Sequence, residues 1–560
     1  MNSDKPWLKH YPEGVAHEID LSHYCSLVDV FEESFKRYPN RLVLEIMGKT
    51  LTYRELDHLS KNFAAYLQSL GLEPGSRIAI MFPNVAEYLV AMLGTLRAGL
   101  VVVNINPLYT ARELEYQLKD SGASVLIILE NFCHVYQQIE DQVALKKVIV
   151  SSLGELHGIK GLFINFVARH IKQLVPPWRF PYSRFKEALN LGKGQPFTKP
   201  KIDLNDIAFL QYTGGTTGVS KGAMLLHRNI LANVIQIESW LEPGLKQVKV
   251  EQLVFLCALP LTHIFALTAC ALLGIRKGGL LILVLNPKDI SGFIKLLLRH
   301  PDINIFPAVN TLFHALIHRP DFLKVKLPNL LVTIGGGMAV QKKTADLWQK
   351  LTGVPIAQGY GLSETSPVVC VNTPLVHSFN GSIGLPLPST DIAILDDDGI
   401  ELANGVPGEI CIKGPQVMAG YWNQAEETKR FMTIDGFFKS GDIGIMNDDG
   451  YITIVDRKKD MIVVAGFKVF PNEIEEVISG MQGVSECAVI GTPHRKLGEV
   501  VTAYIVKENT HLTEAQVIQY CKDQMTSYKR PRKIIFVDEL PKSNVGKILR
   551  RALRPISADL

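Results

Sequence analysis

The sequence predicts an α/β fold: a large N-terminal domain of mostly parallel sheets with helices and a β-rich subdomain, then a small α/β C-terminal domain. Three observations carry this prediction. A chain of 560 residues is too long for one hydrophobic core and should divide into two or more domains. Short apolar runs alternate with helical patterns, which is typical of parallel sheets covered by helices. Near residue 456 a charged run interrupts the apolar strands, and about a hundred residues follow, enough for a separate domain.

The alternation is clearest in the first 150 residues. Strand-like apolar runs lie at 77–81, 101–103, 125–129 and 147–150, and helical patterns lie at 53–70 and 86–98. Parallel strands need long crossover connections, usually helices, so this order predicts a parallel sheet. Turns rich in aspartate and glycine bracket a more β-rich stretch at about 381–455. We therefore expect two domains, 1–455 and 456–560.

A loop rich in glycine and hydroxyl groups follows the apolar run 207–210, which reads as a buried strand. Its string is Tyr212, Thr213, Gly214, Gly215, Thr216, Thr217, Gly218, Val219, Ser220, Lys221, Gly222 and Ala223. The glycines let the backbone wrap an anion, the hydroxyls add donors, and Lys221 adds a mobile positive charge. A glycine-rich surface hairpin is the alternative, but the full string is far more specific for a polyphosphate. It is not a Walker A loop, because no glycine directly precedes Lys221.

A second string, 358–365, combines residue types that suit a nucleotide. Tyr360 stands between glycines, so a planar base can lie against its ring. Ser363 can donate to a phosphate oxygen, and Glu364 can hold Mg²⁺ with waters at the remaining positions. Gly336, in a run of three glycines, would let a base or acyl chain approach the backbone; an ordinary strand-to-helix turn is the alternative.

Two further segments place charges that a nucleotide could use. Asp442 follows a Ser-Gly turn, where it could accept both ribose hydroxyls, and Arg457 lies fifteen residues later. Residues 541–551 put Lys547 on a glycine-flexed loop before a short basic helix. Taken singly, Asp442 and Arg457 read as structural residues, and the Lys547 segment reads as a solvated tail.

Together and in this order, the strings resemble those of the adenylate-forming enzymes. The set comprises the phosphate loop, 260–263 with His263, the 358–365 string, 408–422, 440–442, the charged run 456–460 and 541–547. The residues at 106–109 and 470–475 are similar to the corresponding sequences of the bacterial long-chain fatty acid–CoA ligases. The likeness runs from near the N-terminus to about residue 551.

The resemblance implies a two-step ligase that uses ATP, Mg²⁺ and coenzyme A. Lys547 matches the lysine that bridges the fatty carboxylate and the α-phosphate. The loop 213–221 would cradle the β- and γ-phosphates, with Glu364 and Thr213 on Mg²⁺. The adenosine would be seated by Tyr360, Asp442 and Arg457, near Gly336 and Ser363.

For the second step, the resemblance implies that the small C-terminal domain is mobile and rotates about a hinge at Lys459. Gly466 would then face the active site beside the pantetheine of CoA. His263 fits the position that gates the carboxylate and thiol routes. Lys468 and Phe470 depart from the closest relatives, which tend to have asparagine and tyrosine there.

Composition narrows the partners and the compartment. The 59 Lys and Arg against 55 Asp and Glu leave a net charge of +4, too small to imply nucleic acid. Eight scattered cysteines without a CxxC pair, and no apolar signal segment, predict a cytoplasmic protein with reduced thiols. The uncharged stretch 254–275 is long enough to cross a bilayer, but Pro260 and Thr262 help to interrupt it. We expect buried α/β packing there, with a further buried strand at 280–285.

A basic amphipathic segment at 156–186 bears on localisation. It contains no acidic residue, and its apolar positions 162, 163, 166, 167, 171 and 174 fall on one helical face. Such a helix can lie on an anionic membrane, or it can pack that face on the protein's own core, and periodicity does not separate the two. The first interpretation predicts peripheral contact with the inner face of the cytoplasmic membrane.

Two other functions stay open at this point. A fatty acyl-AMP ligase would stop at the adenylate and pass the acyl group to a carrier protein, and CoA dependence separates it from the CoA ligase. A membrane-associated protein for fatty-acid binding or uptake is motivated by 156–186, but Lys547, Glu364 and the phosphate loop argue against it. The sequence fixes neither the preferred acyl-chain length nor whether the protein forms a homodimer.

Overall fold

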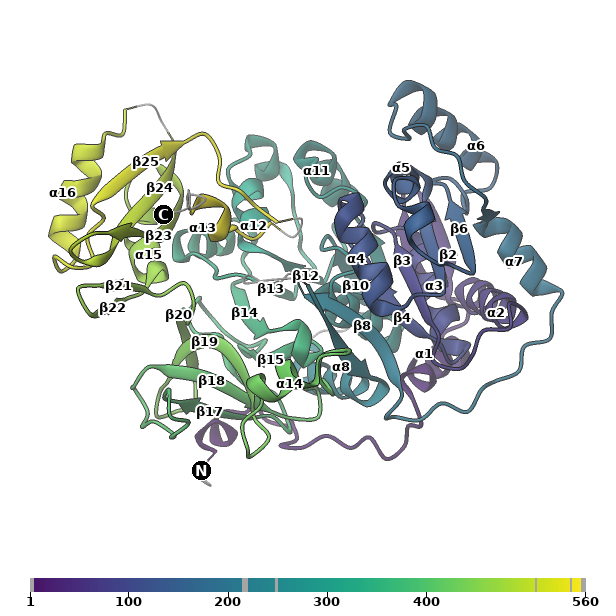
Figure 1. Ribbon diagram of the computed structural model, residues 1–560, viewed down its shortest axis with the longest axis horizontal. Helices are drawn as coiled ribbons and strands as arrows, with labels where there is room; N and C mark the ends of the chain where they lie inside the picture. Colours follow the sequence, from purple (N-terminus) through teal and green to yellow (C-terminus); the bar gives the residue numbers. More distant parts are fainter. Residues whose placement is uncertain (1–4, 214–219, 247–249, 509–510, 544–545, 555–560) are drawn as a thin grey trace.

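The computed structural model in Figure 1 describes residues 5–213, 220–246, 250–508, 511–543 and 546–554. The strands of these residues form four sheets: two large mixed sheets, a four-stranded antiparallel sheet and a C-terminal five-stranded sheet. The α/β class expected from the sequence is confirmed.

The first large sheet has the strand order β7-β6-β5-β3-β4-β8-β9. Neighbouring strands are parallel, except that β8 and β9 form an antiparallel hairpin. The strands are β3 (Arg77–Met81), β4 (Val101–Asn104), β5 (Val125–Leu129), β6 (Lys147–Ser151), β7 (Ser183–Arg184), β8 (Ile207–Thr213) and β9 (Lys221–Leu226). The apolar runs predicted as strands are β3 to β6, which are almost fully buried as parallel strands covered on both faces should be.

The second large sheet has the order β16-β15-β14-β13-β12-β10-β11-β1-β2. Its strands from β14 to β1 run parallel, and β2, β15 and β16 are antiparallel additions at the edges. They are β1 (Leu42–Ile46), β2 (Lys49–Thr52), β10 (Val254–Cys257), β11 (Leu280–Leu283), β12 (Ile305–Ala308), β13 (Val332–Gly335), β14 (Ile356–Gly361), β15 (Val368–Val371) and β16 (Leu385–Pro386).

Helices pack around the two large sheets (Figure 1). They are α1 (Leu27–Arg37), α2 (Tyr53–Ser69), α3 (Ala86–Arg97), α4 (Ala111–Ser121), α5 (Cys133–Gln137), α6 (Ile159–Phe166), α7 (Phe185–Lys193), α8 (His227–Leu245), α9 (Ile264–Ala266), α10 (Leu273–Arg276), α11 (Ile290–Arg299), α12 (Asn310–Ile317) and α13 (Lys342–Thr352). Helix α2 begins at a capping box, because Thr52 Oγ1 accepts the Glu55 amide at 3.2 Å and the Glu55 carboxylate accepts the Thr52 amide at 2.7 Å. Helix α3 is buried along its whole length.

The uncharged stretch 254–275 is part of the core, as expected. It forms β10, α9, a π-helical stretch and most of α10, and almost every residue in it is buried. The strand expected at 280–285 is β11. Within the described ranges, no helix is both long and apolar enough to cross a membrane.

The β-rich stretch expected at about 381–455 is the four-stranded antiparallel sheet, which lies below the large sheets in Figure 1. Its strands are β17 (Asp391–Leu395), β18 (Gly408–Lys413), β19 (Phe438–Met446) and β20 (Ile452–Arg457), with α14 (Ala425–Phe431) between β18 and β19. The C-terminal part, at the left of Figure 1, contains β21 (Ile462–Val464), β22 (Phe467–Val469), β23 (Val484–His494), β24 (Gly498–Lys507), β25 (Lys533–Val537), α15 (Pro471–Ser479) and α16 (Glu514–Gln524).

The C-terminal part has a hydrophobic core of its own, which includes Ile462, Ile474 and Val501. The buried residues of the main N-terminal core end at Ile452. The expected boundary at 455/456 falls inside β20, because residue 456 still pairs with Ile443 of β19. The charged turn 458–461 that follows β20 leads from one core to the other.

Candidate active site

A cavity of about 2830 Å³ lies where the large sheets, the antiparallel sheet and the C-terminal part meet. Its lining includes thirteen of the residues expected to act: Tyr212, Thr213, Ser220, Lys221, His263, Gly336, Tyr360, Ser363, Glu364, Asp442, Arg457, Lys459 and Lys547. Gly222, Ala223 and Gly466 are not among the lining residues. Gly214, Gly215, Thr216, Thr217, Gly218 and Val219 lie outside the described residues.

The expected phosphate loop connects the two strands of the β8–β9 hairpin. Thr213 and Lys221 face each other as its last described pair, and Ser220 Oγ donates to the Thr213 carbonyl at 2.6 Å. The Lys221 ammonium forms an ion pair with Glu427 of α14 and lies 5.3 Å from the centre of the Tyr421 ring. Lys221 therefore already sits at the cavity wall, but an incoming phosphate must compete with Glu427.

The neighbours of these residues on the hairpin have structural partners. The Tyr212 hydroxyl donates to Asp120 at 2.5 Å, away from Thr213. A Cβ on Gly222 would lie 3.1 Å from the Tyr212 ring, so this position has little room for a side chain. The backbone of Gly222 accepts the Trp422 amide at 2.8 Å, and the buried Ala223 forms a β-bridge with Tyr421.

Three residues at one end of the cavity form a polar cluster suited to a nucleoside. The Tyr360 hydroxyl donates to Asp442 Oδ2 at 2.7 Å, and Arg457 Nε lies 3.3 Å from Asp442 Oδ1. Asp442 on β19 and Arg457 on β20 are direct cross-strand partners, which explains why residues fifteen apart in sequence meet. Gly336 also lines the cavity. A Cβ there would lie 3.0 Å from the Phe265 ring, so the position has little room for a side chain.

Glu364 is buried in a short 3₁₀ turn, Ser363–Thr365. Its Oε1 accepts the Tyr421 hydroxyl at 2.8 Å, and burial raises the pKa of its carboxyl group although that hydrogen bond opposes the rise. Within the part of the chain that the structure describes, no three metal-ligating side chains cluster. A single buried carboxylate at the cavity wall fits Mg²⁺ if a polyphosphate binds there, because Mg²⁺ usually takes one or two carboxylates and completes its shell with phosphates and water.

Lys547 and His263 share the same part of the cavity. Burial, together with the nearby charge of Arg457, lowers the pKa of Lys547 to about 7. Burial also lowers the pKa of His263 to about 4, and the Lys547 charge acts in the same direction. Among the described residues, the Lys547 ammonium has no hydrogen-bond or ion-pair partner, so it is free to meet an anion.

The segment that carries Lys547 is held by backbone contacts. Ser543 and Lys547 exchange two bonds, from the Ser543 amide to the Lys547 carbonyl at 2.8 Å and from the Lys547 amide to Ser543 Oγ at 3.1 Å. The Gly546 carbonyl accepts Thr311 Oγ1 at 3.2 Å, across the two domains. Gly546 has a φ of +78°, and a Cβ there would lie 2.5 Å from Thr311 Oγ1, so a side chain would push Lys547 away.

Comparison with known proteins assigns the family. Residues 31–422 match the model of the AMP-binding enzymes, and residues 473–547 match that of the AMP-binding enzyme C-terminal domain. The chain belongs to the AMP-binding enzyme family. It is 48% identical over 553 residues to a long-chain-fatty-acid–CoA ligase of Escherichia coli O6:H1, covering 98% of both chains. It is 36% identical to one of Bacillus subtilis over 561 residues, covering 99% of this chain and 98% of that one.

Solved structures of the same family share the fold. ATP-bound MatB from Rhodopseudomonas palustris superposes with a TM-score of 0.82 at 29% identity, covering 94% of this chain and 98% of that one. The anthranilate CoA ligase AuaEII in complex with anthranoyl-AMP has a TM-score of 0.83 at 25% identity, covering 95% and 97%. The resemblance to adenylate-forming enzymes, and to the fatty acid–CoA ligases among them, is confirmed.

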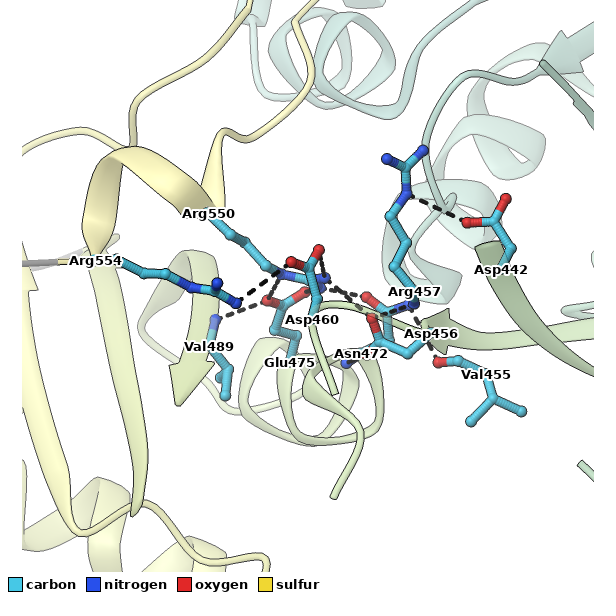
Figure 2. Close-up of polar contacts among 10 residues, drawn as sticks. All are labelled: Asp442, Val455, Asp456, Arg457, Asp460, Asn472, Glu475, Val489, Arg550 and Arg554. Atoms are coloured by element: carbon cyan, nitrogen blue, oxygen red, sulfur yellow. Dashed lines mark hydrogen bonds and ion pairs between the residues drawn. The ribbon is translucent and has the colours of Figure 1, made fainter. Parts of the chain in front are cut away.

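A buried ion network attaches the Lys547 segment of this family enzyme to the turn between its domains (Figure 2). Arg550 Nη2 lies 2.7 Å from Glu475 of α15, and Arg550 Nη1 lies 3.2 Å from Asp456 at the end of β20. The fully buried Asp456 also accepts the amides of Arg457 and Asn472, each at 2.7 Å. Burial raises the pKa of Asp456 to about 6, and Arg550 opposes this rise.

The expected hinge lies beside this network. Lys459 lines the cavity in the turn after β20, and burial lowers its pKa to about 8, with Arg457 acting in the same direction. Gly466 occupies the exposed turn between β21 and β22, with a φ of +86° and open space where a Cβ would be. Lys468 follows in β22 and lies 3.8 Å from Asp397 of the antiparallel sheet. In this arrangement the cavity contains Lys547 and not Gly466.

Sequence reasoning missed several functional neighbours. Tyr421 donates a hydrogen bond to Glu364, and Glu427 forms an ion pair with Lys221. Of these two partners, only Tyr421 falls within a string singled out in the sequence, 408–422. Ile237, Trp240 and Leu241 of α8 line an apolar part of the cavity, but nothing in their pattern separates them from core residues. Residues 309–311 and 336–338 also line the cavity, whereas Phe306, at the start of the same segment, packs on Phe313 and Trp348.

We expect Arg550→Ala to destabilise the C-terminal part by about 3–5 kcal/mol, because it leaves buried carboxylates unpaired. The same change should slow adenylate formation on the order of a hundredfold, since Lys547 loses its attachment. Arg554→Ala is the matched control, because Arg554 is half exposed and lies 3.6 Å from Asp460, which limits its effect to about 1 kcal/mol. Urea unfolding and pyrophosphate release measure the two effects. Equal results for the two variants would contradict this role of the network.

The depressed pKa of Lys547 predicts a pH dependence. The ammonium is charged below its pKa of about 7, so kcat/KM for adenylate formation should fall as the pH rises through that value. Lys547→Arg should remove this fall at a lower overall rate, because the guanidinium stays charged. Lys459→Ala is the control and should retain the fall of kcat/KM with rising pH, because Lys547 is unchanged. Initial rates of pyrophosphate release at low ATP across pH 6 to 9 test this; a flat wild-type profile, or a fall retained in Lys547→Arg, would refute it.

Proposed function

We propose that this member of the family is a long-chain fatty acid–CoA ligase, which converts a fatty acid, ATP and CoA to acyl-CoA, AMP and pyrophosphate. The observation that carries the proposal is the joint position of Lys547, the Tyr360–Asp442–Arg457 cluster and the β8–β9 hairpin around one cavity. The names of the relatives at 36–48% identity support the choice of substrate class. An apolar wall beside these polar groups suits an acyl chain.

In the first step, a carboxylate oxygen of the fatty acid attacks the α-phosphorus of ATP. The bond to the bridging oxygen breaks, and pyrophosphate leaves with the electron pair. Negative charge accumulates on phosphate oxygens, so the buried Lys547 ammonium between carboxylate and α-phosphate stabilises the transition state most. Lys221 and the loop hydroxyls hold the β- and γ-phosphates.

Mg²⁺ would be held by Glu364, with Thr213 beside it. When bound, it would neutralise charge on the phosphate oxygens of ATP. The fit rests on the buried Glu364 carboxylate, whose raised pKa reflects the cost of keeping its charge away from water. Tyr421 orients that carboxylate through its hydrogen bond.

In the second step, the CoA sulfur attacks the acyl carbon and forms the thioester bond. The bond from that carbon to the AMP oxygen breaks, AMP leaves with the electron pair, and the thiol proton passes to solvent. Lys547 occupies the cavity in the arrangement described, so the C-terminal domain that follows β20 would reorient against the N-terminal domain before CoA arrives. The charged turn with Lys459 is the proposed hinge, and the separate hydrophobic cores support motion as rigid units. Gly466 would then approach the pantetheine, with His263 at the crossing of the two routes.

Two alternative functions and two possible partners, the membrane and a second copy of the chain, also have to be tested. Transfer of the acyl group to a carrier protein, and fatty-acid uptake without catalysis, are excluded if CoA-dependent turnover is observed. We also propose that the enzyme works in the cytoplasm in peripheral contact with the cytoplasmic membrane. A homodimer is the rival use of the same exposed surface and is separated from membrane contact below.

Products formed from ATP, Mg²⁺ and palmitate, with and without CoA, test this function on wild type and Lys547→Ala. We expect acyl-CoA and AMP from wild type and at least a hundredfold less adenylate from the variant. Adenylate that accumulates and ignores CoA would move the protein to carrier loading. Absence of AMP under all conditions, with palmitate still bound, would leave only the uptake function.

A further inference from the structure

Helix α6 and the π-helical stretch η4 (Val167–Ile171) that continues it turn their apolar side chains to solvent. Ile159 is 89% exposed and Leu162 73% exposed. We define the outer face of α6 as these two residues with Phe163, Phe166, Ile171 and Leu174, all more than half exposed. Of the two interpretations of this segment, packing of the apolar face on the protein's own core is therefore wrong.

The opposite face of the helix attaches it firmly to the protein. Gly161 meets the backbone of Gly154 so closely that a Cβ there would lie 1.9 Å from the Gly154 carbonyl oxygen. Asn165 accepts the Gly154 amide at 2.8 Å and donates to Ser152 Oγ at 2.9 Å. Arg169 forms a bidentate pair with Glu130, with Nη2 at 2.6 Å. Small and polar residues thus face inward, which is the reverse of an ordinary surface helix.

The charge around the outer face has one sign. Residues 156–186 include no acidic residue. Lys160, Lys172, Arg179 and Lys186 are exposed, and among the described residues their side chains enter no ion pair. Three carboxylates beside the segment have partners: Glu130 pairs with Arg169, Glu155 accepts Ser152 Oγ at 2.8 Å and the Lys186 amide at 3.1 Å, and Glu187 accepts the Arg184 amide at 3.4 Å.

We propose that the outer face of α6 docks on an anionic phospholipid surface, with its apolar side chains in the interfacial layer and its lysines and arginines against the headgroups. This rests on the membrane contact proposed above and identifies the surface that makes it. The 13 residues of α6 and η4 span about 20 Å, too short to cross a hydrocarbon core of about 30 Å, so the helix lies in the plane of the interface.

A second copy of the chain fits this face less well. A two-fold dimer would bring the same patch together, so its cations would face cations without a carboxylate between them. An anionic bilayer instead satisfies both properties of the patch, its apolar side chains and its positive charge. The position of α6 at the periphery of the molecule leaves it accessible to a flat surface (Figure 1).

Vesicle co-sedimentation of the full chain tests the proposal. Vesicles of phosphatidylcholine with phosphatidylglycerol are compared with phosphatidylcholine alone, at low and high salt. We expect wild type to bind the anionic vesicles, and Leu162→Asp with Phe163→Asp to weaken that binding at least tenfold. Lys160→Glu with Lys172→Glu should weaken it and reduce its salt dependence. Ile400→Asp with Ile434→Asp, at exposed apolar residues of the antiparallel-sheet subdomain, is the control and should bind as wild type does.

Melting temperature, CoA ligation and oligomeric state are the three further readouts. Melting temperature checks that each variant folds, and Leu162→Gln with Phe163→Gln replaces a variant that does not. CoA ligation without vesicles should be equal in wild type and the α6 variants. If wild type itself shows no CoA ligation, the proposed enzymatic function is overturned, but the proposed docking surface is not. Unchanged vesicle binding in the α6 variants overturns the proposal, and a dimer that they dissociate would assign the face to a second copy.

Discussion

The geometry of the cavity depends on the buried contact between Arg550 and the carboxylates of Asp456 and Glu475. Asp456 ends the last strand of the antiparallel sheet, Glu475 belongs to the C-terminal domain, and Arg550 follows Lys547 by three residues. One guanidinium therefore joins both domains and the segment that delivers the ammonium. A buried charge left without its partners is costly, so this contact holds the Lys547 segment in a defined place.

The Arg550–Asp456 contact lies next to the proposed hinge. The position of the Lys547 segment and the motion of the C-terminal domain are therefore coupled. The same turn that carries Lys459 is fixed at its start by Asp456 and at its end by Asp460, which lies 3.5 Å from Arg550. In the proposed rotation about Lys459 these ion pairs would have to rearrange, whereas the separate hydrophobic cores on either side could move as units. Ion pairs beside the proposed hinge therefore help to stabilise the arrangement of the domains described here.

Sequence patterns predicted the framework well and the site only in part. The strands β3 to β6 were predicted because their short apolar runs alternate with helical patterns, and α2 was predicted from the helical pattern at 53–70. Tyr212 and Thr213 of the twelve-residue string both line the cavity, but the string does not reveal that the Tyr212 hydroxyl bonds Asp120 of α4, ninety-two positions earlier in the chain. Periodicity located the amphipathic helix α6 but not which face is buried. Glu475 and Arg550 are seventy-five positions apart, and no local pattern links them.

We propose that one arrangement of the domains forms the adenylate and another forms the thioester. Gln341 Nε2 of the N-terminal domain lies 3.3 Å from Ser479 Oγ of the C-terminal domain, so cysteines at these positions can be joined by a short thiol crosslinker. Cys25, the exposed native cysteine, is first replaced by serine. The measurement is adenylate and acyl-CoA formation by the locked and unlocked Gln341→Cys, Ser479→Cys protein. We expect the locked protein to release pyrophosphate and form acyl-adenylate but to make no acyl-CoA. Acyl-CoA formed at the unlocked rate would show that no rearrangement of the domains is needed.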